Sequence, residues 1–351
     1  MCLAYPQAKL LLAQCARGFN PRHTVEGIDS LRGLDNVLFD ISAMAPSNTG
    51  ASPGSSAEGW LTVFMHSRFF LLGAIAMTIA SFPSVLPEDN TTEAHHEKAL
   101  AILRAGLQAL DEADFWPAMH AAEGLTLAGH RGEVRKALEP RLATETDARR
   151  RCGLARELIR AGDLSKVENL ARILASPDAY GHIHAAESLF KVGEVGDAVA
   201  MERAFARQDD IKLRLMAAAA LGRSGAAKPR EAIRDALRGS HADGIMLAGW
   251  ILGQIGGDAD IEPIRSRLSD APTPLVRAYL EHALAMLGDV DGLPALSNNL
   301  GSTDDAIRTV AANMAGEAGA RGTVPALVKL LDDPVPDIRI RAAQSLLMLK
   351  R

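Results

Sequence analysis

The stretch VPALVKLLDDPVPDIRIRAAQSLLML at residues 324–349 decides the fold of this chain. Four apolar residues in its first half recur at i, i+3, i+4 and i+7, namely Val324, Leu327, Val328 and Leu331. That spacing is typical of one face of a helix. The residues Asp332, Asp333 and Pro334 favour a turn, and a second apolar helical stretch follows. The segment therefore predicts a pair of helices.

The second helix of this pair recurs along the chain. Stretches containing Ala-Ala-x-x-Leu appear at 119–129, 181–193, 214–225 and 339–349. The end of each unit recurs every 30 to 33 residues, at Gly129, Gly162, Gly193, Gly225, Gly256, Gly288, Gly319 and Leu349. A repeat of this length is a supersecondary unit that buries its apolar face by stacking on its neighbours. The small alanines allow close helix approach, and each Gly is expected at a left-handed helix C-terminus.

Residues 96–350 resemble HEAT repeats of the phycobilisome-lyase-like type, and the match is best at 324–349. The resemblance implies an all-α fold, an α-solenoid of about eight HEAT-like helix pairs in an armadillo-like superhelix. Such repeats occur in chromophore lyases, in the metal-dependent deoxyhypusine hydroxylase and in binding scaffolds. The resemblance therefore indicates architecture and leaves the function open.

Composition agrees with a helical repeat protein, because 48% of the residues are hydrophobic and only 4% are aromatic. There are 38 basic and 43 acidic residues, and the resulting net charge of −5 argues against a general nucleic-acid partner. The sequence contains no phosphate-binding glycine loop, nucleophile elbow, HExxH motif or paired-cysteine metal site. We therefore expect no catalytic residues and no cofactor.

The segment from Met65 to Ala80 reads as a signal peptide, with Arg68 followed by a 12-residue apolar run and small residues at its end. A buried or membrane-spanning helix is the alternative, but the run is short against the roughly 20 residues that cross a bilayer. Residues 81–95 are expected to be a linker. We therefore expect export if Met65 is the true start, with no membrane span after removal of the signal, and a cytoplasmic location otherwise.

Residues 1–64 are expected to form a poorly structured or fragmentary extension. Within them, residues 8–43 resemble one βα unit of the amidohydrolase-related TIM-barrel family, in which the metal-binding His would fall at Gln14. One unit cannot close a barrel of eight. The leading explanation is an over-extended reading frame or the tail of a neighbouring gene, and a degenerate fusion is the alternative.

The single cysteine of the repeats, Cys152, follows three arginines at 149–151. Neighbouring cations would lower the pKa of its thiol and make it reactive. The alternative is a small core residue in an Ala-rich helix, which is the interpretation we favour. Removal of the leader would leave no second cysteine for a disulfide.

By the same resemblance, the second helices line the concave side, and their register gives a first group of candidates. Glu123, Arg156 and Glu187 occupy corresponding positions in successive units and are expected to form an alternating ladder of charges. An acidic or basic ligand is the first alternative. A metal held by His120 with Glu123, or by His184 with Glu187, is the second, because His and Glu at i and i+3 share a helical face.

A shared metal centre for those two pairs is excluded by their spacing. One whole unit separates the two His-Ala-Ala-Glu motifs. Adjacent helices pack about 8 to 10 Å apart, so the motifs should lie on the order of 16 to 20 Å apart. The two ions of a dinuclear centre need to be about 3.5 to 4 Å apart.

The second group is Trp250, Tyr279 and His282, which occupy adjoining places in units five and six. Aromatic anchors of this kind are typical of a protein-binding hot spot. Arg223 and Gln254 would add hydrogen-bond donors at its edge. Aromatic packing between helices is the alternative, because Trp is usually mostly buried.

These observations favour a non-catalytic scaffold that binds a protein partner on the concave face of the array. The competing class is an enzyme, resembling either a metal-dependent hydroxylase or a chromophore lyase. A small-molecule ligand and a purely structural role remain open.

Overall fold

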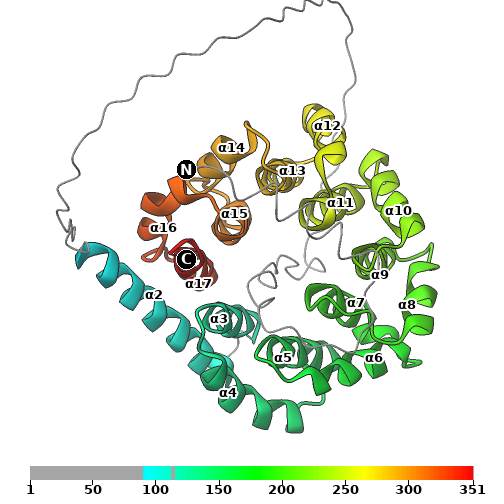
Figure 1. Ribbon diagram of the computed structural model, residues 1–351, viewed down its shortest axis with the longest axis horizontal. Helices are drawn as coiled ribbons and strands as arrows, with labels where there is room; N and C mark the ends of the chain where they lie inside the picture. Colours follow the sequence, from blue (N-terminus) through cyan, green and yellow to red (C-terminus); the bar gives the residue numbers. More distant parts are fainter. Residues whose placement is uncertain (1–89, 112–114, 351) are drawn as a thin grey trace, which may run out of the picture. The chain divides into compact units, whose positions relative to one another are not determined.

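A computed structural model describes residues 90–111 and 115–350 of the chain, and every secondary-structure element there is helical (Figure 1). Contacts divide the chain into two compact units, Val37–Ala94 and a second unit that includes His95–Arg351. The extension at 1–64 and the expected signal peptide at 65–80 lie outside the described residues. The first helix begins at Asn90, so it includes the last residues of the expected linker, 81–95.

The helices form eight successive pairs in the described part of the chain, as the repeat predicts. The first members, called the outer helices, are α2 (Asn90–Gln108), α4 (Arg131–Thr144), α6 (Val167–Ala175), α8 (Ala198–Phe205), α10 (Ala227–Arg238), α12 (Asp258–Arg267), α14 (Gly292–Asn299) and α16 (Val324–Leu330). The second members, called the inner helices, are α3 (Phe115–Leu127), α5 (Ala148–Arg160), α7 (His182–Lys191), α9 (Ile211–Arg223), α11 (Ala242–Ile255), α13 (Pro274–Leu287), α15 (Asp305–Glu317) and α17 (Pro336–Leu349). Short 3-10 turns lie at Ala109–Asp111, Leu164–Lys166, Ala179–Gly181, Leu268–Asp270 and Arg321–Thr323. The expected α-solenoid is confirmed.

The inner helices of the second unit make a closed circuit rather than an open superhelix. Each packs against the next from α3 to α17, and α17 packs in turn against α3 (Figure 1). The sequence did not predict this closure. Repeats specify the contact between neighbouring units, whereas the curvature depends on a small rotation at each unit that the residue pattern does not reveal.

Helix α2 packs across the contact between the first and last inner helices. A Cβ atom at Gly106 of α2 would lie 2.9 Å from Ala121 Cβ of α3 and 2.9 Å from Ile340 Cδ1 of α17. The Lys98 ammonium of the same helix lies 2.6 Å from the Asp332 carboxylate, which precedes α17. Glycine at 106 therefore allows one outer helix to approach both inner helices closely.

The helix ends follow the predicted glycine chemistry with one exception. Six of the expected glycines have positive φ angles: Gly129, Gly162, Gly193, Gly225, Gly288 and Gly319. At Gly162, for example, the N–H of Asp163 donates to the carbonyl of Leu158, as in a Schellman motif. The prediction is wrong at Gly256, whose φ of −77° and ψ of −166° are those of extended backbone. The next helix, α12, begins almost at once, and the Asp260 carboxylate accepts a hydrogen bond from the Gly257 N–H at its start.

The core lies between the inner and outer helices and is built of leucines and alanines. The paired alanines of successive inner helices are buried, among them Ala121, Ala122, Ala342 and Ala343. Side chains this small allow the inner helices to pack closely. None of the helices in the described residues has both the length and the apolar character that crossing a bilayer requires.

Candidate functional site

The aromatic group predicted as a hot spot is buried in the closed ring. Trp250 is 1% exposed, Tyr279 4% and His282 0%. Trp250 packs edge-on against the Phe190 ring of α7, with ring centroids 5.5 Å apart. His282 is directed elsewhere, because its Nε2 accepts a hydrogen bond from Asn299 Nδ2 at 3.1 Å. These three side chains are therefore packed between helices, which is the alternative given above, and do not form a surface patch.

Burial also sets the protonation of this group. It lowers the pKa of His282 to about 3, so the ring is neutral at pH 7. Burial raises the pKa of the Tyr279 hydroxyl, and the nearby Glu187 carboxylate raises it further. Neither residue therefore offers a charge at physiological pH.

The two residues expected at the edge of that patch have other contacts. The Arg223 guanidinium lies over the Phe190 ring, 4.3 Å from its centroid. The Gln254 amide donates to Glu317 Oε2 of α15 at 3.1 Å. These two side chains therefore do not form a rim around Trp250 in the closed ring.

The charged column is built into the structure, but with partners that the register did not predict. Glu123 accepts a hydrogen bond from Arg341 of α17 at 3.0 Å, and it also lies 3.5 Å from Arg160 of α5. Arg156 donates instead to Glu157 at 2.7 Å. Glu187 pairs with Lys191, one turn further along the same helix, at 2.5 Å. An ion-pair network is present, whereas the simple alternation of Glu123, Arg156 and Glu187 does not describe its pairs.

These contacts join into a chain of side chains that we call the inner polar network. Its members, in order of contact, are Gln254, Glu317, Asn313, Arg341, Glu123, Arg160, Glu157 and Arg156. The network runs through α11, α15, α17, α3 and α5, all of them inner helices. Most of these side chains are buried, and buried charges persist in proteins when they are paired and hydrogen-bonded.

The four metal candidates lie in two separate environments. His120 Nδ1 lies 2.6 Å from Asp337 Oδ1 of α17. Burial and the Arg341 charge lower the pKa of His120 to about 4, so the neutral ring donates through Nδ1. The His184 ring stacks on Trp116 at 5.1 Å, and its Nδ1 lies 3.9 Å from Glu187. Among the residues with described positions, no group of three His, Cys, Asp or Glu side chains could hold a metal ion.

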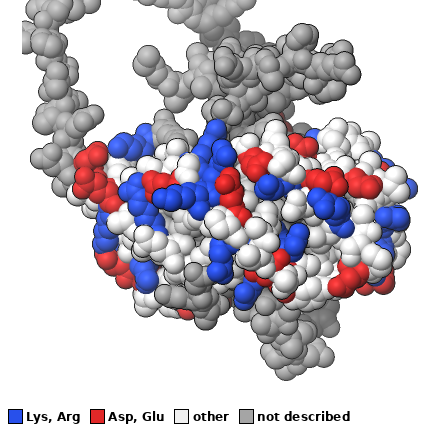
Figure 2. All heavy atoms as spheres, turned by 90° about the horizontal axis from the view of Figure 1, so that it is seen from below, with Lys and Arg blue, Asp and Glu red and all other residues white. Residues whose placement is uncertain are grey.

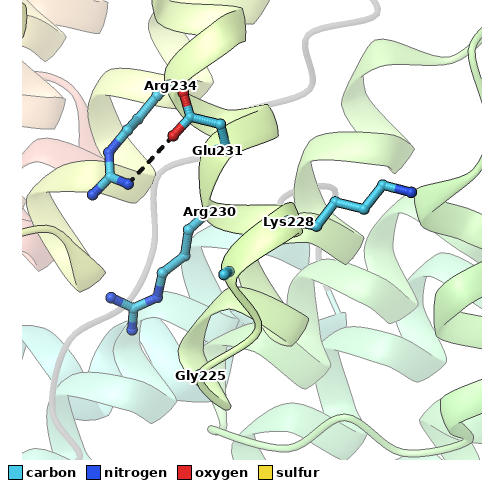
Figure 3. A pocket seen from close by; sticks show the side chains of 6 residues that line it. Gly225, Lys228, Arg230, Glu231 and Arg234 are labelled. Atoms are coloured by element: carbon cyan, nitrogen blue, oxygen red, sulfur yellow. Dashed lines mark ion pairs between the residues drawn. The ribbon is translucent and has the colours of Figure 1, made fainter.

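Two hollows lie on the outer side of the described solenoid. One, of about 680 Å³, lies at the turn from α9 to α10, where Arg230 and Arg234 extend to the same side and Lys228 points away (Figure 3). Both arginines already have partners, because Arg230 donates to the Gly222 carbonyl at 2.7 Å and Arg234 to Asp260 at 2.7 Å. The Arg234 charge is therefore compensated by a carboxylate, whereas the carbonyl contact does not neutralise Arg230.

The second hollow is a groove of about 470 Å³ between α6 and α8. Val167, Ala171 and Ala175 contribute one side of it from α6, and Val199 contributes from α8. The Val199 side chain is 68% exposed. Over the face drawn in Figure 2, Lys and Arg side chains are interspersed with Asp and Glu and do not form a field of one sign.

Comparison with known proteins supports the repeat architecture. The HEAT repeat family matches residues 200–285 and 293–350. Among solved structures, human deoxyhypusine hydroxylase in complex with glycerol is 17% identical with a TM-score of 0.38, and the match covers 74% of this chain and 98% of that one. An engineered protein is 19% identical with a TM-score of 0.28, over 72% of this chain and 96% of that one. No curated protein matches.

These two structural likenesses are too weak to carry an argument about activity. The phycobilisome-lyase-like subtype and the amidohydrolase likeness of residues 8–43 stay predictions. The family match and the eight helix pairs agree on the architecture: residues 200–285 and 293–350 carry HEAT repeats, and the described chain is folded as an α-solenoid.

Proposed function

We propose that this chain is a non-catalytic scaffold that binds a protein partner on the outer side of its solenoid. The observation that carries the proposal is a difference between the two sides of the repeat. The side chains of the inner polar network satisfy one another through ion pairs and hydrogen bonds, whereas a groove with apolar residues between α6 and α8 is open to solvent. HEAT repeats commonly mediate protein interactions.

The occupant we propose for this groove is an apolar face of a partner helix. Val167, Ala171 and Ala175 lie at i, i+4 and i+8 of α6, so they form one small-residue row along the helix. Small side chains allow close approach of a second helix, and the exposed Val199 adds apolar surface on the other side. The ion pair between Glu168 and Arg172, at 3.2 Å, neutralises two of the three charged residues that line the groove, and Asp197 is the third.

The competing class is an enzyme that uses His120, Glu123, His184 and Glu187 with a metal. Those residues pair with Asp337, Arg341, Lys191 and one another, and the two His-Ala-Ala-Glu motifs do not converge. Metal content separates the two classes. Stoichiometric iron or zinc in the wild-type protein that is lost in His184→Ala would favour the enzyme.

The scaffold proposal is tested by two matched substitutions at exposed valines. Val199→Glu places a charge in the groove, and Val290→Glu places one in the turn between α13 and α14, where the side chain is 80% exposed. A partner purified with the native protein should bind wild type and Val290→Glu equally and bind Val199→Glu at least tenfold more weakly, as measured by calorimetry. Equal binding by all three proteins would exclude the groove as the docking site.

We also propose that the partner is met outside the cytoplasm, because the segment Met65–Ala80 has the pattern of a signal peptide. The intact mass and N-terminal sequence of the native protein test this. A mature chain that starts near Ser81 supports export, whereas a chain that retains residues 65–80 contradicts it.

A further inference from the structure

One pair of neighbouring inner helices, α3 and α17, is not connected through a single outer helix, because the two lie at opposite ends of the described chain. We call this contact between α3 and α17 the seam. Every other neighbouring pair of inner helices is joined through a single outer helix and two short connections. The seam brings together residues 218 positions apart, as Arg341 and Glu123 show. Neighbouring units can therefore separate at the seam while all other unit contacts stay intact.

The seam is also held by charged groups. His120 and Asp337 pair across it at 2.6 Å, and Glu123 and Arg341 pair at 3.0 Å. By contrast, α11 and α13 meet through apolar atoms: a Cβ at Gly249 would lie 2.7 Å from Leu280 Cδ2. Charged groups regain their hydration when a contact opens, whereas apolar surface does not. Opening at the seam therefore exposes groups that water solvates well.

Helix α2 is the one outer helix that contacts both sides of the seam. Leu103 packs at Gly124 of α3, and Gly106 approaches Ile340 of α17. The ion pair of Lys98 with Asp332 is exposed and so contributes little to holding α17. Since α2 precedes α3 in the chain, we expect it to stay with α3 when the two sides separate.

We propose that the ring is a gate that opens at the seam, and that protonation of His120 favours the open form and exposes the inner helices. The charged groups around His120 come from α17, α3, α5 and α2. Asp337 and Arg341 come from α17, Glu123 from α3 itself, and Arg156 and Arg160 from α5. From α2, Lys98 is engaged with Asp332 and Arg104 with Glu133.

The direction of the pH response follows from these groups. In the closed ring, burial and the Arg341 charge lower the pKa of His120 from 6.5 to about 4. In the open form the imidazole meets water and its pKa returns toward 6.5. The open form therefore binds the proton more tightly, and it gains on the closed form as the pH falls from about 6.5 toward 4. A difference of that size shifts the equilibrium by on the order of 100-fold.

Two engineered disulfides with the same Cβ–Cβ distance separate the seam from the rest of the ring, although a Cβ at Gly124 also lies 2.9 Å from Leu103 Cδ1 and so requires that flexible side chain to shift. A Cβ at Gly124 would lie 3.3 Å from Gln344 Cβ, so Gly124→Cys with Gln344→Cys bridges the seam. A Cβ at Gly253 would also lie 3.3 Å from Ala283 Cβ, so Gly253→Cys with Ala283→Cys bridges α11 and α13 as the control. Both double variants of the full chain carry Cys2→Ser and Cys15→Ser, so that the buried Cys152 is the only other cysteine.

The measurement is amide hydrogen exchange of α3 and α17 at pH 7.5 and pH 5, corrected for intrinsic rates. Protection of these two helices should fall at least tenfold at pH 5 in wild type and in the oxidised control. It should not change in the oxidised seam variant. His120→Asn keeps a donor for Asp337 but does not titrate, so its protection should fall less than threefold.

Three results would overturn the proposal. The first is equal loss of protection in all inner helices, which indicates global unfolding. The second is the same loss in the seam disulfide as in the control. The third is unchanged protection of α3 and α17 at pH 5 in wild type. A reduced seam variant that behaves as wild type shows that the two substitutions themselves leave the ring able to fold.

Discussion

Arg341 in the last helix donates a hydrogen bond to Glu123 in the first inner helix at 3.0 Å. The same nitrogen also lies 3.1 Å from Asn313 Oδ1 and 3.1 Å from Gln344 Oε1. One guanidinium therefore connects three inner helices at the point where the ring closes. Because Arg341 and Glu123 are both almost fully buried, each depends on the other to compensate for its lost hydration.

Replacing Arg341 with Met should destabilise the protein by about 3 kcal/mol, because the buried Glu123 carboxylate then loses the cation that donates to it at 3.0 Å. The free energy of unfolding from urea titration measures this. Arg277→Met is the matched control: its pair with Glu281 is exposed on the arginine side, and its loss should cost less than about 1 kcal/mol. A double variant, Arg341→Met with Glu123→Gln, should recover part of the loss.

Stability measurements can also isolate the contribution of a glycine in the left-handed conformation at a helix end. Gly162 has a φ of +104° and no atom within 4 Å of a Cβ placed there, so Gly162→Ala adds backbone strain without a clash. We expect a loss of about 1 to 2 kcal/mol. Gly322 has equal space and no positive φ, so Gly322→Ala should be neutral or slightly stabilising. Equal effects at the two positions would contradict the conformational explanation.

The repeat predicted more of the fold than of the site. Period and alanine spacing are local features, so they predicted helix pairs and the glycine ends at six of seven positions. Ring closure depends on contacts between residues 218 positions apart, and one sequence without relatives gives no signal for them. The register did place Glu123 and Arg341 on the inner helices. It could not show that α17 returns to α3, and so it paired Glu123 with Arg156 and offered Trp250 as a binding anchor.

Cys152 is expected to be unreactive in the native protein. The three neighbouring arginines alone would lower the pKa of its thiol and make it reactive. Burial raises the pKa of its thiol to about 12, and the Arg156 charge offsets this only in part. The thiolate is the reactive form, so its population at pH 8 is negligible. Peptide mapping after brief alkylation should find Cys152 modified in urea and unmodified in buffer. Rapid native modification would show that the thiol is accessible and ionised.

Acid should destabilise the protein through His282 even if the seam stays closed. Its pKa is about 3 in the folded protein against 6.5 for an ordinary imidazole, and its burial is the cause. Because the folded pKa is the lower one, the unfolded chain takes up the proton first. The full contribution to stability is present above pH 6.5, and it is lost progressively as the pH falls toward 3. Urea midpoints at pH 7.5, 6 and 5 should therefore decrease in wild type.

His282→Gln isolates this residue, because glutamine is neutral at all three pH values and keeps an acceptor for the Asn299 amide. The variant should start with lower stability at pH 7.5, since the ring's packing is lost. Its decrease from pH 7.5 to pH 5 should then be smaller than that of wild type by about 2 kcal/mol, the linkage expected for one histidine over the 1.5 pH units below 6.5. Identical slopes for the two proteins would mean that His282 is hydrated in the native state.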